Sequence, residues 1–115
     1  MWYHQEESAI IGPLLAYEQE HPHAKLLLVY ADGSSCHAVL VTSYESDNEN
    51  LVEQDPSVRY DEFYVVLYEV LDIVRRGMVN NLIADGMLEV DYRQAPVKVI
   101  DEARDVVVYD LQAQR

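Results

Sequence analysis

The sequence predicts a mainly β protein, with an N-terminal helix followed by a strongly bent antiparallel sheet of five or six strands or a small barrel. Three observations predict this fold class. Two β-rich segments flank an Asp-Gly pair, further segments alternate apolar and polar residues as strands do, and a helical stripe comes before them. The chain has 115 residues and half of them are apolar, so we expect one domain covering residues 1–115.

The first element is a helix expected over residues 5–21. Its apolar side chains fall on one stripe, and Pro22 ends the pattern because the residue before a proline disfavours the helical conformation. Ser8 is a candidate N-cap. Pro13 cannot donate to the helical hydrogen-bond ladder, so a shorter helix that begins at Pro13 stays open as an alternative.

A β-hairpin is expected next. Residues 25–30 and 35–42 are β-rich and flank the Asp-Gly pair at 32–33, which is the strongest hairpin signal in the chain because glycine accepts positive φ at little cost. Cys36 and His37 are adjacent on the second strand, so their side chains point to opposite faces of the sheet. We expect Cys36 to be a small buried hydrophobic residue and not a nucleophile.

Residues 63–76 fit two patterns. Their apolar spacing suits a helical stripe, but the run Phe-Tyr-Val-Val-Leu-Tyr is β-branched and aromatic, which favours a strand. We predict a long strand, and an α+β fold in which residues 61–76 are helical is the alternative. Residues 77–86 are expected to form a loop. Shorter strands are expected at residues 87–92, 97–100 and 106–111.

The segment 45–62 is the most acidic part of the chain, with seven acids and one base, and it contributes −6 to the net charge of −13. We interpret it as a long exposed connection, and loops of this length are often functional. Tyrosines flank it, and tyrosine offers contact area at interfaces while keeping a polar tip. The predicted binding residues are Tyr44, Glu45, Asp47, Asn48, Glu49, Asp55, Tyr60, Asp61, Glu62 and Tyr64.

Charge and composition exclude several classes of function. A net charge of −13 repels phosphate backbones and anionic membranes, so we expect neither a nucleic-acid partner nor a membrane partner. The longest apolar runs have six residues and are too short to span a bilayer. The single cysteine cannot form an intrachain disulfide, and the first seven residues lack the features of a signal peptide, so we expect a cytoplasmic protein.

No motif for catalysis or cofactor binding is present. The chain lacks Gly-x-Ser-x-Gly, a phosphate-binding glycine-rich loop and a Rossmann fingerprint. His21 and His23 share a face of an extended segment, as metal ligands can, but no Cys-x-x-Cys or His-Glu-x-x-His spacing accompanies them. The run 47–50 lacks the glycine and the spacing of a calcium loop. We therefore predict no catalytic residue, no metal ligand and no cofactor.

Two resemblances add to this interpretation. The run Tyr-Glu-Ser-Asp-Asn at 44–48, followed by Asp-Pro at 55–56 and Glu-Phe-Tyr at 62–64, resembles a small family of uncharacterised bacterial proteins, which implies no particular activity. The element order, a helix and then a meander of bent strands, resembles the small Sm-like and SH3-like barrels. That resemblance implies assembly into rings and RNA binding. The negative charge of this chain argues against the RNA binding and not against the assembly.

The sequence therefore predicts a non-enzymatic protein–protein interaction module that meets a basic protein partner through residues 45–62. Its most specific form is an acidic inhibitor or immunity-type protein for a basic toxin or nuclease. Two alternatives stay open. One is an oligomeric Sm-like or SH3-like structural or regulatory module, in which strand edges pair between copies. The other is a small metal-dependent enzyme that uses His21, His23 or the acidic cluster.

Overall fold

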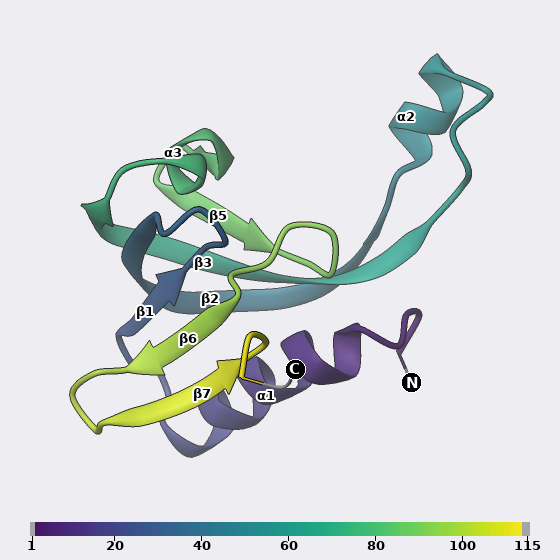
Figure 1. Cartoon of the computed structure of the whole chain (residues 1–115). Helices are drawn as coiled ribbons and strands as arrows, with labels where there is room; N and C mark the ends of the chain where they lie inside the picture. Colours follow the sequence, from purple (N-terminus) through teal and green to yellow (C-terminus); the bar gives the residue numbers. More distant parts are fainter. Residues whose placement is uncertain (1, 114–115) are drawn as a thin grey trace.

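A computed structural model describes residues 2–113 and confirms the mainly β fold class (Figure 1). Its strands form one antiparallel sheet in the order β4-β5-β3-β2-β1-β6-β7, with α1 packed on one face. The elements are α1 (Glu7–Glu20), β1 (Leu26–Val29), β2 (Ser35–Asp47), α2 (Glu49–Gln54), β3 (Glu62–Arg75), α3 (Met78–Leu82), β4 (Ile83–Ala84), β5 (Met87–Val90), β6 (Lys98–Asp101) and β7 (Val106–Asp110).

The sheet is bent but open. β4 and β7 stand at the two ends of the strand order and do not pair with each other, so the barrel form of the prediction is not adopted. The sheet has seven strands, and the one beyond the expected six is the two-residue β4. No helix within residues 2–113 is long and apolar enough to cross a membrane.

α1 supplies the helical side of the core. Ile11 and Leu14 are buried in the same apolar cluster as Leu28 and Tyr68 of the sheet. The helix continues through Pro13, so the shorter-helix alternative is wrong, because burial of side chains on both sides of the proline outweighs the lost hydrogen bond. Ser8 lies inside the helix and is not its N-cap, since its hydroxyl donates to the Gln5 carbonyl at 2.8 Å.

The predicted hairpin is present as β1 and β2. These strands pair from Leu26 opposite Ala38 to Val29 opposite Ser35, and Gly33 in the turn has a φ of +86°. Cys36 is buried as expected, and burial raises the pKa of its thiol to about 11. His37, on the other face, contacts carboxylates of Asp72 and Glu102.

The segment after Asp61 is a strand. β3 runs from Glu62 to Arg75 and pairs with β2 along the whole of that strand, so the helical alternative for residues 61–76 is wrong. The many β-branched and aromatic side chains of this segment suit a sheet that is half covered by α1.

Residues 77–86 are more ordered than the predicted loop, because they form α3 and β4. Groups from the β1–β2 turn hold the start of α3. The Met78 amide donates to Asp32 Oδ2 at 2.7 Å, and the Val79 amide donates to Ser34 Oγ at 3.1 Å. These partners are distant in the sequence, so a short window does not show them, and the one local cap is the Asn80 side chain, which accepts the Gly77 amide at 2.9 Å.

The acidic segment 45–62 is not one continuous loop. β2 continues to Asp47 and β3 begins at Glu62, and the connection between them contains α2. Residues 44–65 project from the sheet as a two-stranded ribbon with α2 at its far end, and we call these residues the arm (Figure 1). The strand prediction stopped too early because the acidic residues of the ribbon have no buried face and so no apolar alternation.

Candidate functional site: an acidic arm and its root

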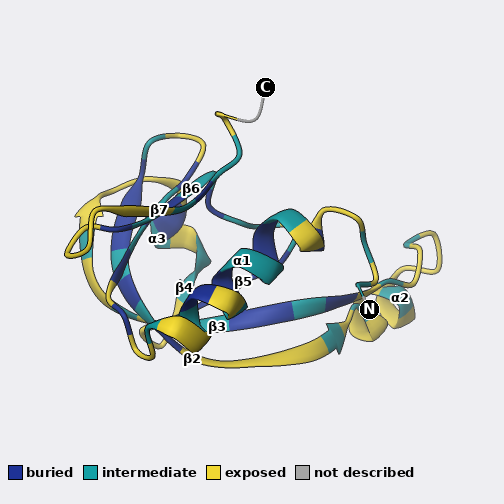
Figure 2. Cartoon of the chain, turned by 90° about the horizontal axis from the view of Figure 1, so that it is seen from below, coloured by how far each residue is buried: buried dark blue, intermediate teal, exposed yellow. Residues whose placement is uncertain are grey.

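The arm carries all ten residues of the predicted binding site. β1 pairs with β2 only as far as Ala38, and β5 pairs with β3 only from Val66 onward, so the two strands of the arm pair only with each other. α2 has no buried residue, and Leu51 and Tyr60 are each 52% exposed. The far end of the arm is therefore exposed and negatively charged and displays Leu51 and Tyr60, and Figure 2 shows α2 as mostly exposed. Nearer the sheet, Phe63 and Val65 of the arm are buried.

The ten predicted residues divide into two groups. Three are half-buried and take part in holding the arm together: Asn48, Asp61 and Tyr64. Seven are exposed and available to a partner: Tyr44, Glu45, Asp47, Glu49, Asp55, Tyr60 and Glu62.

Two exposed tyrosines are held by carboxylates. The Tyr44 hydroxyl donates to Glu89 Oε1 at 2.8 Å, and the Tyr60 hydroxyl donates to Glu62 Oε1 at 3.0 Å. Burial and the Glu89 carboxylate raise the pKa of Tyr44 to about 12. The hydrogen bond to Glu62 is the main cause that raises the pKa of Tyr60 to about 12. Both phenols therefore stay protonated at neutral pH and present oriented rings to solvent.

Asn48 closes the loop that carries α2. Its side-chain oxygen accepts a hydrogen bond from the Asp61 amide at 2.7 Å, and its side-chain nitrogen donates to the Arg59 carbonyl at 2.8 Å. The Asn48 amide also donates to the Asp61 carbonyl at 3.2 Å. One side chain thus joins the two ends of the connection, and the role of Asn48 is to shape the arm.

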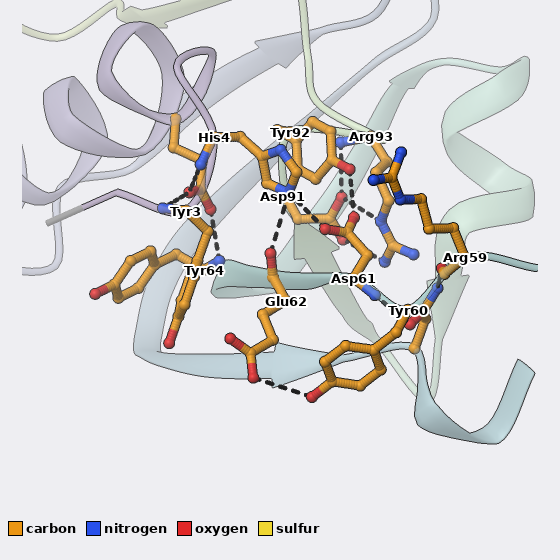
Figure 3. A network of polar contacts seen from close by, with 12 residues as sticks. Tyr3, His4, Arg59, Tyr60, Asp61, Glu62, Tyr64, Asp91, Tyr92 and Arg93 are labelled. Carbon is orange, nitrogen blue, oxygen red and sulfur yellow. Dashed lines mark hydrogen bonds and ion pairs between the residues drawn. The ribbon is translucent and has the colours of Figure 1, made fainter. Parts of the chain in front are cut away.

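A polar network fixes the base of the arm to the rest of the protein (Figure 3). His4 Nε2 lies 2.6 Å from Asp61 Oδ1 and 3.1 Å from the Glu62 carbonyl. The Tyr92 hydroxyl donates to the second oxygen of Asp61, and the His4 and Tyr92 rings stack with centroids 3.9 Å apart. Asp61 is therefore held from both sides, by the N-terminal segment and by the segment after β5.

The charged forms of His4 and Asp61 stabilise each other. Burial opposes ionisation of His4, but the contact with Asp61 outweighs burial and raises the pKa of the imidazole above 6.5. Burial likewise acts to raise the pKa of Asp61, but hydrogen bonds from Tyr92 and His4 outweigh it and lower that pKa below 3.8. The pair is therefore most stable as imidazolium and carboxylate.

Glu7, in the first turn of α1, is the second part of the root. Its side chain is fully buried, and its oxygens accept three backbone hydrogen bonds. Tyr3 and His4 donate to Oε1 at 2.8 and 2.9 Å, and Tyr64 donates to Oε2 at 2.6 Å. Glu7 therefore fixes the N-terminal segment and the β3 strand of the arm to the same helix.

An ion pair completes the root, and of its two partners Asp91 is fully buried while Arg93 is exposed. The guanidinium of Arg93 donates to both oxygens of Asp91, at 3.2 and 3.0 Å, and the Arg93 amide donates to Asp91 Oδ1 at 2.8 Å. The Arg93 guanidinium also lies 3.8 Å above the ring of Phe63, the first buried residue of β3. These contacts fix Phe63 between the arm and the body of the sheet.

A pocket of about 360 Å³ lies at the root, and its lining residues are His4, Asn48, Arg59, Tyr60, Asp61, Tyr92 and Arg93. His4 Nε2 and the Asp61 carboxylate are engaged with each other, with the Glu62 carbonyl and with the Tyr92 hydroxyl. Among residues 2–113, no histidine ring bonds to a Ser, Thr or Cys side chain. The contacts of His4 and Asp61 join the arm to the N-terminal segment and to Tyr92.

Metal-ligating side chains are not gathered in the part of the chain that the structure describes, where no three His, Cys, Asp or Glu residues come together as a metal site. His21 packs against the ring of Tyr17, with centroids 4.8 Å apart, and His23 lies at the turn after α1 with a φ of 60°.

Five residues of the root were not predicted from the sequence: His4, Glu7, Asp91, Tyr92 and Arg93. An acidic residue in the first turn of a helix is common on protein surfaces, so Glu7 carries no local sign of burial. His4 and Tyr92 meet Asp61 only through the fold. The one available signal was the polar run Asp91-Tyr92-Arg93 directly after a strand, where functional and bracing residues often occur.

Comparisons of this chain with protein-family models, with curated proteins and with solved structures gave no match. What the chain does must therefore be inferred from its own geometry and chemistry.

Proposed function

We propose that this protein is a non-enzymatic interaction module whose acidic arm docks on a basic protein partner. In its most specific form the partner is a basic toxin or nuclease, and this chain is its inhibitor or immunity-type protein. The observation that carries the proposal is the arm itself, an exposed ribbon that projects beyond the sheet and concentrates charge, tyrosine and leucine at one end (Figure 1).

The composition of the arm supports a protein partner that is basic. Residues 45–62 hold −6 of the net charge of −13, and such a field attracts a basic surface and speeds association with it. Tyr60 is more than half exposed, and tyrosine is among the residues that supply most of the binding energy at protein interfaces. Leu51, which is exposed to the same extent, adds apolar area that a partner can bury. Charge alone would serve solubility, but exposed apolar residues in the same place favour contact.

The shape of the arm supports an inhibitory role. A projecting element fits a concave surface, and the substrate sites of enzymes are concave. The root holds the arm through Glu7, Asp61 and Arg93, so the arm is ordered before it meets a partner. An ordered binding element loses less conformational entropy on association than a flexible one, which favours tight binding.

Charge reversal on α2 tests the proposal. Glu49 and Glu53 are exposed, and their side chains make no hydrogen bond or ion pair among the described residues. The double variant Glu49→Lys/Glu53→Lys and wild-type protein are used as baits in a lysate of the native host, and each retained protein is then purified and titrated. We expect basic proteins on the wild-type bait, with a dissociation constant at least about tenfold weaker for the variant, or about 1.4 kcal/mol.

The matched control is Glu20→Lys/Glu69→Lys, which changes the net charge by the same amount at exposed positions on α1 and β3 outside the arm. We expect this control to bind as wild type does. Equal weakening by both double variants would mean that net charge alone matters, and unchanged binding by the α2 variant would mean that the arm is not the interface.

A further inference from the structure

β2 has a long edge without a neighbouring strand. β1 pairs with β2 only between Ser35 and Ala38, whereas β2 continues to Asp47. Beyond Ala38, no strand within residues 2–113 lies on that side of β2, and β3 occupies the other side along the whole length. Val41 is an extra residue in the pairing with β3, so it bends β2 where the unpaired edge begins.

A groove runs beside this edge. Its volume is about 640 Å³, within the range of protein sites that bind ligands. α1 and the N-terminal segment form one wall, and Leu40, Thr42 and Ser43 of β2 form the other. Trp2 and Leu15 give the groove an apolar lining, and Glu18 is its one charged residue. Figure 2 shows the exposed half of β2 running toward α2.

We propose that an extended, basic segment of a partner protein adds to this edge of β2 as a further strand. The unpaired N–H and C=O groups of an edge strand are a template for main-chain hydrogen bonds with an incoming peptide. The added strand would continue the line of β1 across the groove. Its alternate side chains would enter the groove beside Trp2 and Leu15, as successive side chains of a strand point to opposite faces.

The charges of the surface select a basic occupant. Glu18 lies in the groove, Glu45 and Asp47 are exposed on β2, and no Lys or Arg lines the groove. A second copy of this chain, paired edge to edge, would bring these carboxylates toward their own counterparts, and like charges facing each other across strands are destabilising. The occupant that fits alternates apolar residues, for the groove, with Lys or Arg, for the acids.

This inference rests on the proposed function for the basic character of the partner, and it shares the exposed acids Glu45 and Asp47 with it. It adds the unpaired edge of β2 and the groove, which the proposed function does not need, whereas the test of the proposed function changes only α2. The two can therefore fail separately.

A synthetic Lys-Val-Lys-Val-Lys-Val peptide tests the added strand. Wild-type protein is titrated with this peptide, with its all-D form, and with two forms N-methylated on alternate residues. These peptides have the same charge, but one N-methylated form loses the donors that face β2. We expect the L-peptide to bind at least about tenfold more tightly than the D-peptide and the blocked form, and to slow amide hydrogen exchange in residues 42–47.

Ala16→Arg supplies the matched protein variant. Ala16 is exposed and lines the groove, so an arginine there fills the groove and repels the peptide without touching the core. Ala103→Arg makes the same change in the exposed β6–β7 turn. We expect only Ala16→Arg to weaken binding, by at least about tenfold.

Three results would overturn the proposal: equal binding of the L- and D-peptides, equal effects of Ala16→Arg and Ala103→Arg, or a wild-type dimer in sedimentation that protects residues 42–47. If peptide binding fails while Glu49→Lys/Glu53→Lys still abolishes partner capture, the added strand is wrong and the proposed function stands. If the peptide binds while Glu49→Lys/Glu53→Lys captures the partner as wild type does, the proposed function is wrong and the added strand stands.

Discussion

The Glu7 carboxylate accepts a hydrogen bond from the Tyr64 amide at 2.6 Å, across 57 residues of sequence. This contact joins the first turn of α1 to the β3 strand of the arm. Because the same carboxylate also accepts the amides of Tyr3 and His4, one buried side chain joins the N-terminal segment, the helix and the arm. The arm is a built element of the fold, and its root can be tested apart from its interface.

Glu7→Gln tests the root directly. The variant keeps the size of the side chain but replaces one accepting oxygen with an NH₂ group, which cannot accept a backbone hydrogen bond. The glutamine amide is also neutral, so the hydrogen bonds that it still accepts are no longer strengthened by a charge. We therefore expect the free energy of unfolding to fall by about 1–3 kcal/mol. Urea unfolding measures the change. Unfolding at the wild-type midpoint would show that this carboxylate does not hold the arm.

The contact between His4 and Asp61 predicts a pH dependence of stability. The raised pKa of His4 gives a contribution that is complete below 6.5 and is lost as pH rises through the raised value. The lowered pKa of Asp61 gives a contribution that is complete above 3.8 and is lost as pH falls through the lowered value. The difference in melting temperature between wild type and His4→Gln should therefore be largest at about pH 5.5 and smaller at about pH 9.

His23→Asn is the control for this measurement. His23 is exposed and its positive φ of 60° is one that asparagine tolerates. The ion pairs of His37 are present in all three proteins, so they cancel in the differences. The difference in melting temperature between wild type and His4→Gln could instead be the same at both pH values, or grow toward pH 9. Either result would contradict the assignment of an imidazolium–carboxylate pair.

Gly77 is the point where α3 meets the β1–β2 turn. A Cβ at this position would lie 2.6 Å from Asp32 Oδ2 and 2.8 Å from Ser34 Cβ, and the backbone has a φ of +155°. Asp32 cannot move away freely because it accepts the amides of Met78 and Ser34. We expect Gly77→Ala to lower the free energy of unfolding by about 1–3 kcal/mol.

Gly86→Ala gives the comparison for Gly77. Gly86 also has a positive φ, of +75°, but no atom lies within 4 Å of the Cβ that would be added. Gly86→Ala should therefore lower the free energy of unfolding through backbone strain alone, by about 1 kcal/mol. Chemical denaturation of both variants should rank Gly77→Ala as the more destabilising, and the reverse order would show that the contact with Asp32 yields easily.

The body of the fold could be predicted from the sequence because its signals are local. The Asp-Gly pair at 32–33 located the β1–β2 hairpin, and the β-branched run after Asp61 indicated β3. α3 was missed because its N-terminal partners, Asp32 and Ser34, lie in another part of the chain. Long-range capping of this kind leaves no mark in a short window of sequence.

The arm was predicted as a charged exposed segment but not as a ribbon. Its strands pair with each other, and the β2 strand of the arm has no buried residue, so that strand needs no apolar alternation. Asp61 was assigned to the interface as an acid of the run 45–62 and Tyr64 as a tyrosine that flanks it, whereas in the fold the Asp61 carboxylate contacts His4 and the Tyr64 amide donates to Glu7. Composition therefore indicated a candidate site, and only the fold separated the residues that brace it from those that face solvent.

Photo-cross-linking in the native host tests the central claim most directly. A photoreactive residue is placed at Leu51 on α2 and, as the control, at Leu71 on β3, since these leucines are 52% and 49% exposed. We expect a covalent adduct with a basic protein from position 51 and none from position 71. Adducts from position 71 alone, or adducts of position 51 with acidic proteins alone, would contradict docking of the arm on a basic partner.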